Sequence, residues 1–352
     1  MVLELRRPIV QAPMAGGPSV PALAAAVSEA GGLGFLAAGY KSPEAVREEI
    51  RAVRARTGRR FGVNVFVPGT RPADDEALRR YAAELQSEAE RWGVGLGEPV
   101  ADDDAWEAKV AVLVEERVPV VSFTFGLPRP GMVAELHDAG ARVLVTITTP
   151  GEALAAADGG ADALVVQGIE AGGHRGGFRD EDGVGEHGLL VLLRLVAGRV
   201  GLPLVAAGGI MDGASVAAAL VAGAEAAQLG TAFLCCPEAG TSPAQRAALR
   251  TYEHTAVTRA FSGRRARGLA NRFLVEHSAT APAAYPQVHH LTGPLRAAAR
   301  RAGDPEGMSL WAGQGHPLVE ALPAGELVHR LTEDARAELL SAVTAVAAPC
   351  PS

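Results

Sequence analysis

Residues 203–233 read PLVAAGGIMDGASVAAALVAGAEAAQLGTAF, and this stretch indicates the fold. It contains two short apolar runs, Pro203–Ala206 and Ala226–Leu229. An alanine-rich segment, Gly213–Ala222, lies between them and follows Asp212, a residue type that often caps helices. Continuous apolar runs that alternate with helices are typical of a parallel sheet, because its strands are buried on both faces. The stretch therefore predicts a strand, a crossover helix and a second, parallel strand.

The same unit recurs along the chain. Further strands are predicted at Pro8–Gln11, Leu33–Leu36, Phe61–Phe66, Val118–Phe123, Arg142–Ile147 and Ala163–Gln167. Helical segments are predicted at Val20–Ala30, Pro43–Arg56, Met132–Ala139, Gly151–Ala157 and Leu189–Ala197. Ser19 and Ser42 precede the first two of these helices as start signals. Eight strands with helical crossovers predict an α/β protein, a (β/α)8 barrel, and an open doubly wound sheet is the alternative with the same local pattern.

Two regions are longer than this repeat requires. A charged, helical excursion follows the third predicted strand, and a long remainder follows the eighth. We therefore predict a barrel made of residues 1–68 and 118–235, an inserted helical segment at 69–117, and a C-terminal helical extension at 236–352.

The composition limits the class of protein. The chain has 352 residues, of which 48% are hydrophobic and 21% charged, as in ordinary globular proteins. Its net charge of −7 provides no electrostatic basis for binding nucleic acid or an anionic membrane. No signal peptide or membrane span is apparent. Cys235, Cys236 and Cys350 suggest neither a disulfide framework nor a metal pair, so we expect a reduced, cytoplasmic protein.

Glycines mark the two positions where such barrels commonly hold phosphate, the loops after strands seven and eight. Gly208 and Gly209 follow the seventh predicted strand, and Gly230 and Thr231 follow the eighth. Glycine leaves backbone N–H groups open to an anion, and a helix N-terminus follows the first pair. Either loop alone could simply form a tight turn, but together they predict a ligand that carries phosphate.

A histidine and an asparagine are the candidate chemical groups. His174 lies between two glycine pairs, Gly172-Gly173 and Gly176-Gly177, after the sixth predicted strand. Imidazole titrates near neutral pH and suits proton abstraction or the binding of an anion, although a solvated loop histidine is the plain alternative. Asn64 lies within a buried strand, where its amide would bond either a ligand or neighbouring backbone.

Other motifs carry less weight. Gly183–Gly188 fits GxGxxG but follows a loop, so it lacks the geometry of a dinucleotide site. The acidic runs 74–76 and 102–104 are interpreted as helix starts rather than metal ligands, and no metal is expected. The basic run from Arg259 to Arg272 would either close over a phosphate or form ion pairs.

Taken together, several of these motifs resemble the nitronate monooxygenase family, formerly called 2-nitropropane dioxygenases. The motifs are Gln11–Gly16, Gly62–Asn64, Gln167–Gly176, Ala206–Ile210, Gln228–Phe233, Thr258–Gly263 and Ser309–Gly315. They run in order along nearly the whole chain. The resemblance implies a flavoprotein oxidoreductase, an FMN-containing TIM barrel that needs no metal. It also implies oxidation of alkyl nitronates, such as propionate 3-nitronate, by O2 to a carbonyl compound and nitrite.

The resemblance also implies roles for individual residues. Those matching FMN contacts or close neighbours are Met14, Asn64, Gln167, Gly172, Gly208, Gly209, Gln228, Leu229, Gly230 and Thr231. His174 matches the active-site histidine, and substrate contacts are expected from Thr124, Ser262 and His290. Two positions depart from the pattern. Thr124 stands where many members of one class have histidine, and Arg265 stands where the family often has proline.

Three alternatives remain open. FMN-dependent NAD(P)H reductases that act on enoyl thioesters or quinones share the barrel and the histidine loop, and the arginine run would then bind nucleotide phosphates. Chemistry like that of inosine monophosphate dehydrogenase needs a nucleophilic cysteine in a mobile loop, and Cys235 and Cys236 are misplaced for it. A flavin-storing protein without turnover is the third. The expected partners are a small-molecule substrate and O2, with a homodimer carried as a further expectation.

Overall fold

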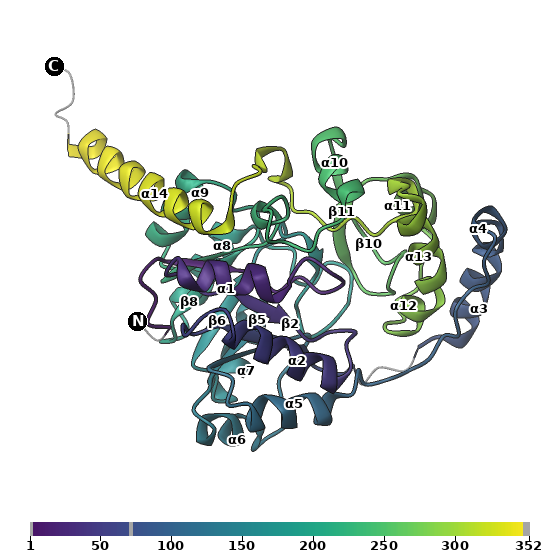
Figure 1. The fold of residues 1–352 in the computed structure, drawn as a ribbon, viewed down its shortest axis with the longest axis horizontal. Helices are drawn as coiled ribbons and strands as arrows, with labels where there is room; N and C mark the ends of the chain where they lie inside the picture. The colour runs from purple at the N-terminus through teal and green to yellow at the C-terminus, as the bar shows by residue number, and fades with distance from the viewer. Residues whose placement is uncertain (1–2, 70–72, 348–352) are drawn as a thin grey trace.

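A computed structural model describes residues 3–69 and 73–347 of the chain (Figure 1). Within these ranges, eight parallel strands form one sheet in the order β1-β9-β8-β6-β5-β4-β3-β2. The strands are β1 Ile9–Gln11, β2 Phe35–Ala37, β3 Gly62–Phe66, β4 Val120–Thr124, β5 Arg142–Ile147, β6 Ala163–Gln167, β8 Leu204–Ala207 and β9 Ala226–Leu229. Every predicted strand overlaps one of them, so the predicted α/β fold class is confirmed.

The first and last strands of this order meet and close the barrel. Val10 and Leu33 form an isolated parallel bridge, and the Gln11 N–H donates to the Leu33 carbonyl oxygen at 2.9 Å. The Gln11 side chain extends this seam, because its Oε1 accepts the Phe35 N–H at 2.9 Å. The Gln11 side chain thus supplies a hydrogen bond between β1 and β2 that the backbone does not make. The alternative of an open doubly wound sheet is wrong, since such a sheet would leave these two edges apart.

Helices cover the outside of the barrel (Figure 1). They are α1 Pro21–Glu29, α2 Pro43–Arg54, α5 Trp106–Glu115, α6 Met132–Asp138, α7 Pro150–Asp158, α8 Leu189–Ala197 and α9 Gly213–Val221. The Ser42 and Asp212 side chains cap α2 and α9, as predicted. The start signal at Ser19 was wrong. Val20 is the N-cap of α1, and the Ser19 hydroxyl instead accepts the Met14 N–H at 2.8 Å, within the loop after β1.

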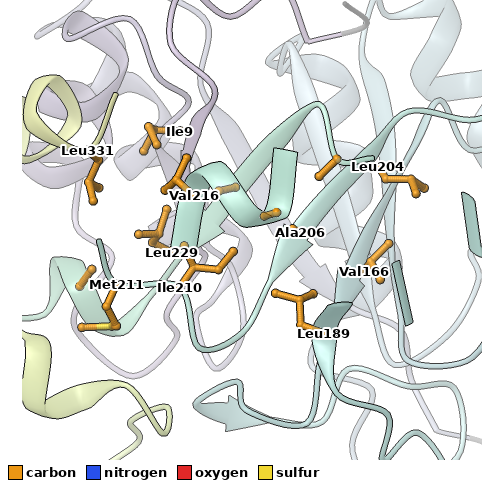
Figure 2. Close-up of a cluster of buried hydrophobic side chains, with 14 of the residues drawn as sticks. Ile9, Val166, Leu189, Leu204, Ala206, Ile210, Met211, Val216, Leu229 and Leu331 are labelled. Atoms are coloured by element: carbon orange, nitrogen blue, oxygen red, sulfur yellow. The ribbon is translucent and has the colours of Figure 1, made fainter. Parts of the chain in front are cut away.

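Apolar side chains pack inside the barrel and also between its strands and the surrounding helices. Successive residues of a strand point to opposite faces. Val165 and Val205 accordingly belong to the inner cluster, while Val166 and Ala206 belong to the layer between strands and helices. Figure 2 shows this outer layer, which also includes Ile9, Leu189, Leu204, Val216, Leu229 and Leu331. The many small residues of the sequence allow the helices to approach the strands closely.

The inserted segment has two different parts. Helices α3 (Asp75–Glu84) and α4 (Gln86–Trp92) lie beside the C-terminal helices (Figure 1), where Tyr81 shares an apolar cluster with Phe261 and Phe273. Helix α5, in contrast, packs on β3 and α2 as a regular crossover helix. The boundaries 69 and 117 stay predictions, and residues 70–72 lie outside the described residues.

The C-terminal extension is mostly helical, as predicted. Its helices are α10 Pro243–Thr251, α11 Arg272–His277, α12 Gln287–Leu291, α13 Gly293–Ala302 and α14 Ala324–Ala347. It also contains a hairpin, β10 (Thr255–Thr258) and β11 (Ala266–Leu269), that the sequence analysis missed. Helix α14 returns to the barrel and packs on α9 and α1, so the division at residue 235 stays a prediction.

Two observations concern the cysteines and the expected absence of a membrane span. Cys235 and Cys236 are free and buried, and Cys350 lies outside the described residues. None of the described helices is both long enough and apolar enough to cross a membrane.

Candidate active site

A cavity of about 340 Å³ opens at the carboxyl ends of the barrel strands. Its wall includes Met14 after β1, Asn64 on β3, Thr124 on β4, Gln167 on β6 and Gln228 on β9. The volume falls in the range of about 300–1,000 Å³ that is usual for small-molecule sites. This end of a (β/α)8 barrel is also where active sites occur. Predicted residues from many parts of the chain therefore meet at one place.

The backbone of His174 is held in position from two sides. It belongs to a short strand, β7 (Gly173–His174), which pairs antiparallel with β11 at Ala266. On the other side, the Gln167 amide donates to the His174 carbonyl oxygen at 3.1 Å and accepts the Gly176 N–H at 2.8 Å. The missed hairpin and a residue predicted to contact the cofactor thus both fix the histidine loop.

The His174 ring lies in an aromatic enclosure. Its centroid is 5.5 Å from that of Trp311, 5.8 Å from Phe125 and 5.9 Å from Tyr285. Burial, together with the positive charge of Arg264, lowers the pKa of His174 to about 3. The imidazole is therefore neutral at neutral pH, where it can accept a proton but does not itself present a positive charge to an anion.

One end of the cavity is built from unpaired backbone N–H groups. Among the hydrogen bonds of the described residues, none uses the N–H of Gly208, Gly209, Gly230 or Thr231. Gly209 has a φ of +71°, and a Cβ there would lie 3.1 Å from the Cβ of Glu170. Among the described residues that line the cavity, none is an aspartate or glutamate. Open donors in a cavity wall whose described residues include no carboxylate fit an anionic group such as a phosphate.

The Asn64 amide nitrogen bonds the neighbouring strand, whereas its contact with a ligand stays a prediction. Its Nδ2 donates to the Ser122 hydroxyl and to the Thr124 hydroxyl, both at 2.9 Å, on the neighbouring strand. Its Oδ1 makes no hydrogen bond with the described residues. It is also not one of their buried side-chain atoms that lack a partner, so it remains accessible. The amide is therefore oriented by β4 with its oxygen left for a ligand. Thr124 accepts a hydrogen bond from Asn64 and also lines the cavity.

Most of the predicted site residues line the cavity, and two do not. Gly172, Gly208, Gly209, Gly230, Thr231 and Ser262 lie in the wall with the residues named above. Leu229 does not, because its side chain packs in the outer core layer and its carbonyl oxygen accepts the Ala12 N–H at 2.8 Å.

His290 is the second exception. Its ring pairs with Asp102 at 2.8 Å, away from the cavity, and the neighbouring His289 lines the cavity instead. Successive helix residues differ by about 100° in direction, so a one-residue difference moves the side chain to another face. His290 is therefore not a cavity residue, and His289 takes its place in the wall, where it stacks on Tyr40 with 4.0 Å between ring centroids.

Sequence reasoning missed several residues of the wall. Phe66 could have been found, because it lies two residues after Asn64 on one strand and so shares its face. Tyr40 and Arg296 carried no such pattern, and Trp311 lay in the motif Ser309–Gly315 without being assigned to the site. They reach the cavity from loops and helices whose positions depend on long-range packing.

Three arginines of the basic run between residues 259 and 272 form ion pairs. Arg259 and Arg265 share Asp180 at 2.9 and 3.0 Å, and Arg272 pairs with Glu88 at 2.6 Å. None of the arginines in this run lines the described cavity. The ion-pair interpretation holds for these three arginines. Arg264 and Arg267 instead donate to backbone carbonyl oxygens, and the run does not line the described cavity as a phosphate clamp would.

These features define a class of protein, a (β/α)8-barrel enzyme whose cavity combines open backbone N–H groups with a neutral histidine. The chain belongs to the nitronate monooxygenase family, because the sequence model of that family, "Nitronate monooxygenase", matches residues 2–334. The resemblance found in the sequence is thereby confirmed, and the chain is a flavin-dependent oxidoreductase of this family.

Individual relatives support this assignment. The chain is 45% identical to the nitronate monooxygenase of Pseudomonas aeruginosa, over 95% of this chain and 98% of the relative. It is 43% identical to that of Paraburkholderia phytofirmans, over 95% and 93%. Among solved structures, nitroalkane oxidase from Streptomyces ansochromogenes superposes with a TM-score of 0.93 at 54% identity, covering 98% and 99% of the two chains. FabK from Thermotoga maritima superposes with a TM-score of 0.77 at 30% identity, covering 98% and 97%.

Proposed function

We propose that this protein uses FMN to oxidise alkyl nitronates with O2, forming a carbonyl compound and nitrite. The observation that carries the proposal is the neutral His174 in a cavity that has open anion donors and, among its described residues, no carboxylate. Family membership and the names of the relatives support the same reaction.

The residues that would hold FMN divide into two groups. The N–H groups of Gly208, Gly209, Gly230 and Thr231 would bind its phosphate. Polar side chains from the strand ends, Asn64, Gln167 and Gln228, would face the ring system, with Met14 and Gly172 beside it. When bound, FMN supplies the electron transfer between the nitronate and O2.

The protein contributes a base and an enclosure. A neutral nitroalkane must lose its α-proton to become a nitronate, and His174 would take that proton. Burial lowers the pKa of the imidazole, which keeps it unprotonated and also makes it a weaker base. Aromatic rings around the imidazole limit the access of water and strengthen electrostatic contacts there. When the substrate is already a nitronate, the α-proton has been lost and His174 has no proton to remove.

The alternative is an FMN-dependent reductase that takes electrons from NAD(P)H. The similarity to FabK and the shared barrel favour it. The arginine run, the expected partner of the nucleotide phosphates, argues against it. Arg259, Arg265 and Arg272 are ion-paired, and no arginine of the run lines the described cavity. A cytoplasmic location and a homodimer stay predictions.

One comparison tests the proposal. Purified protein is denatured to identify the released cofactor, and O2 uptake is measured with ethyl nitronate and propionate 3-nitronate. Oxidation of NADH and NADPH is measured in parallel with a quinone and an enoyl thioester. We expect FMN, O2 uptake with nitronates and stoichiometric nitrite. Rapid NAD(P)H oxidation without nitronate turnover would establish the reductase instead, and a colourless protein that does not take up FMN would indicate neither.

The His174→Asn variant tests the role of the base. It should retain FMN and lose about 10²–10⁴-fold in kcat/KM with neutral nitroethane, the range typical of general base catalysis. The loss with ethyl nitronate should be smaller, since that substrate has no α-proton to lose. Equal losses with both substrates would contradict the assigned role.

A further inference from the structure

The four tyrosines of the chain differ in how their hydroxyl protons are used. Tyr81 donates to a backbone carbonyl oxygen, Tyr252 donates to a carboxylate, and Tyr285 donates to the Tyr40 hydroxyl at 3.4 Å. Tyr40 only accepts, since no hydrogen bond among the described residues uses its own hydroxyl proton. It is also the one described tyrosine that lines the cavity. The tyrosine with a free proton is therefore the one that a ligand in the cavity can reach.

The Tyr40 hydroxyl is a neutral and strong donor. Burial raises the pKa of its phenol to about 12, so the hydroxyl keeps its proton at neutral pH. The hydrogen bond from Tyr285 enters the Tyr40 oxygen, and a hydroxyl that accepts one hydrogen bond becomes a better donor of another. The free proton of Tyr40 therefore suits an oxygen that carries negative charge.

The position of Tyr40 is fixed through its backbone and its ring. It follows β2 with a φ of +67°, in the left-handed region that is uncommon for a bulky residue. Its N–H donates to the Asp104 carboxylate at 3.0 Å, and Asp104 pairs with the buried Lys109 at 2.6 Å. Its ring stacks on His289, with 4.0 Å between centroids. Strained backbone of this kind concentrates at active sites, where the surrounding contacts hold it in place.

Tyr40 lies in the same part of the cavity as His174. The centroid of the Phe66 ring is 5.6 Å from that of Tyr40 and 6.5 Å from that of His174, and all three residues line the cavity. Tyr285, whose hydroxyl bonds that of Tyr40, has its ring centroid 5.9 Å from that of His174. A small substrate that reaches the base can therefore also reach the Tyr40 hydroxyl.

Removal of the α-proton creates a need for such a donor. When the proton of a nitroalkane passes to His174, the electron pair of the broken C–H bond forms a C=N bond and negative charge moves onto the nitro oxygens. A donor that is already placed where this charge develops lowers the barrier, and the need is greater because His174 is a weak base. The Ser262 hydroxyl does not supply it, because it donates to the Arg264 carbonyl oxygen.

We propose that Tyr40 is a further catalytic residue, whose hydroxyl donates a hydrogen bond to a nitro oxygen of the substrate as that oxygen gains negative charge. This inference rests on the proposed function for its reaction, but the hydrogen bond can be tested without turnover.

The first test is Tyr40→Phe, which removes only the hydroxyl and keeps the stacked ring. With neutral nitroethane, the hydrogen bond forms to charge that develops during proton removal, so the loss should appear mainly in kcat. With ethyl nitronate, the charge is present from the start, so the loss should appear mainly in KM. Each loss should be about 10- to 150-fold, the effect of a hydrogen bond to a charged group. Tyr252→Phe removes a hydroxyl outside the described cavity and should change neither parameter.

The second test measures binding alone. Propionate has the shape of ethyl nitronate and a similar delocalised charge, but it has no nitro group to be oxidised. Propionate and the uncharged propionamide are titrated into the flavin-loaded protein and followed by calorimetry. Tyr40→Phe should weaken propionate about tenfold or more and propionamide by a smaller factor. If the wild type binds propionate in this Tyr40-dependent way but oxidises neither nitroethane nor ethyl nitronate, the proposed function fails and the hydrogen-bond site stands.

Trp311 provides the comparison within the cavity. Its ring centroid is 5.5 Å from that of His174, and its indole N–H makes no hydrogen bond with the described residues and is not one of their buried atoms that lack a partner. Trp311→Phe removes this second donor and should reduce kcat with nitroethane less than Tyr40→Phe does. A larger loss in Trp311→Phe would assign the nitro oxygens to the indole and overturn the inference.

Three results with Tyr40→Phe itself would also overturn the inference. A variant that melts like the wild type and loses neither kcat with nitroethane nor affinity for propionate would leave the hydroxyl without a role. Losses confined to KM with both substrates would indicate a changed cavity shape rather than a missing donor to developing charge. A selective loss of FMN affinity would assign the hydroxyl to the cofactor.

Discussion

The ring Nε2 of His174 lies 2.8 Å from the hydroxyl oxygen of Ser262. That hydroxyl also donates to the carbonyl oxygen of Arg264 at 3.2 Å. Because a carbonyl oxygen can only accept, the hydroxyl proton points to Arg264, and Ser262 accepts from the Nε2–H of His174. The neutral imidazole then carries its lone pair on Nδ1, which has no described protein partner and is not sealed from the cavity. Ser262, predicted as a substrate contact, therefore also sets the tautomer of the base.

Replacing Ser262 by alanine tests this positioning role. Without the acceptor, the imidazole has no fixed tautomer or orientation, and we expect kcat/KM with neutral nitroethane to fall about tenfold or more, with bound FMN retained. Turnover of ethyl nitronate should fall less, since no proton is removed. Ser262→Cys keeps a weak acceptor and should recover part of the activity. Equal losses with both substrates would show that Ser262 contacts substrate rather than orienting the base.

Gly209→Ala tests the phosphate site. At a φ of +71° a Cβ is strained, and there it would lie 3.1 Å from the Cβ of Glu170, so the loop must shift. We expect FMN affinity to fall about tenfold while the weaker affinity for riboflavin changes little, measured by fluorescence titration of the apoprotein. Gly201→Ala is the control, because a Cβ at that exposed position meets nothing within 4 Å. If the affinity for riboflavin falls by the same factor, the substitution affects binding of the ring system rather than of the phosphate.

Asp180→Asn tests whether the basic run has a structural role. Asp180→Asn leaves Arg259 and Arg265 with only their more exposed partners, Asp182 and Glu186. The loss of the hydrogen bonds to the Asp180 carboxylate should cost about 1.5–3 kcal/mol of unfolding free energy. The control Glu181→Gln removes only an exposed contact of 3.9 Å with Arg179 and should cost less than about 1 kcal/mol. Urea denaturation measures both. Unchanged stability in Asp180→Asn, with an altered response to NAD(P)H, would revive the role of the run in binding nucleotide.

The barrel could be predicted from the sequence because each strand is marked by a pattern within a few consecutive residues. Runs such as Arg142–Ile147 and Ala163–Gln167 are buried on both faces, and their uniform apolar pattern sets them within a residue or two. Glycines at strand ends are equally local, so Gly208 and Gly230 were found. The His174 loop was found as a motif, but its pairing with the β11 hairpin was not, since a two-residue strand has no period to detect.

The missed part of the site depends on tertiary packing. Arg296 is one arginine among many on an amphipathic helix, and no local pattern says that it faces the cavity while Arg301 is exposed. His289 and His290 are adjacent, and only the orientation of α12 decides which one turns inward. The sequence thus identifies the residues carried by strand ends, whereas the helices that complete the cavity require the structure.

Stability should depend on pH through His174 and His289. Burial lowers the pKa of both rings, to about 3 and about 2, while in the unfolded chain each titrates near 6.5. Below about pH 6.5 the unfolded state therefore binds more protons than the folded state, and the unfolding free energy decreases as the pH falls. Between pH 7 and pH 5 each histidine should remove about 2 kcal/mol at most, since one pKa unit corresponds to 1.36 kcal/mol.

Urea denaturation of the FMN-saturated protein between pH 5 and pH 7 measures this dependence. The wild type should lose more stability on acidification than His174→Asn or His289→Gln, because each variant lacks one ring that is buried in the neutral form. His254→Asn is the control, since that side chain is 84% exposed and its removal should leave the pH dependence unchanged. Carboxylates also titrate near pH 5, but they are common to all four proteins and cancel in the differences. If the curves of the variants run parallel to that of the wild type, the two rings are not held neutral, and a neutral base at His174 is wrong.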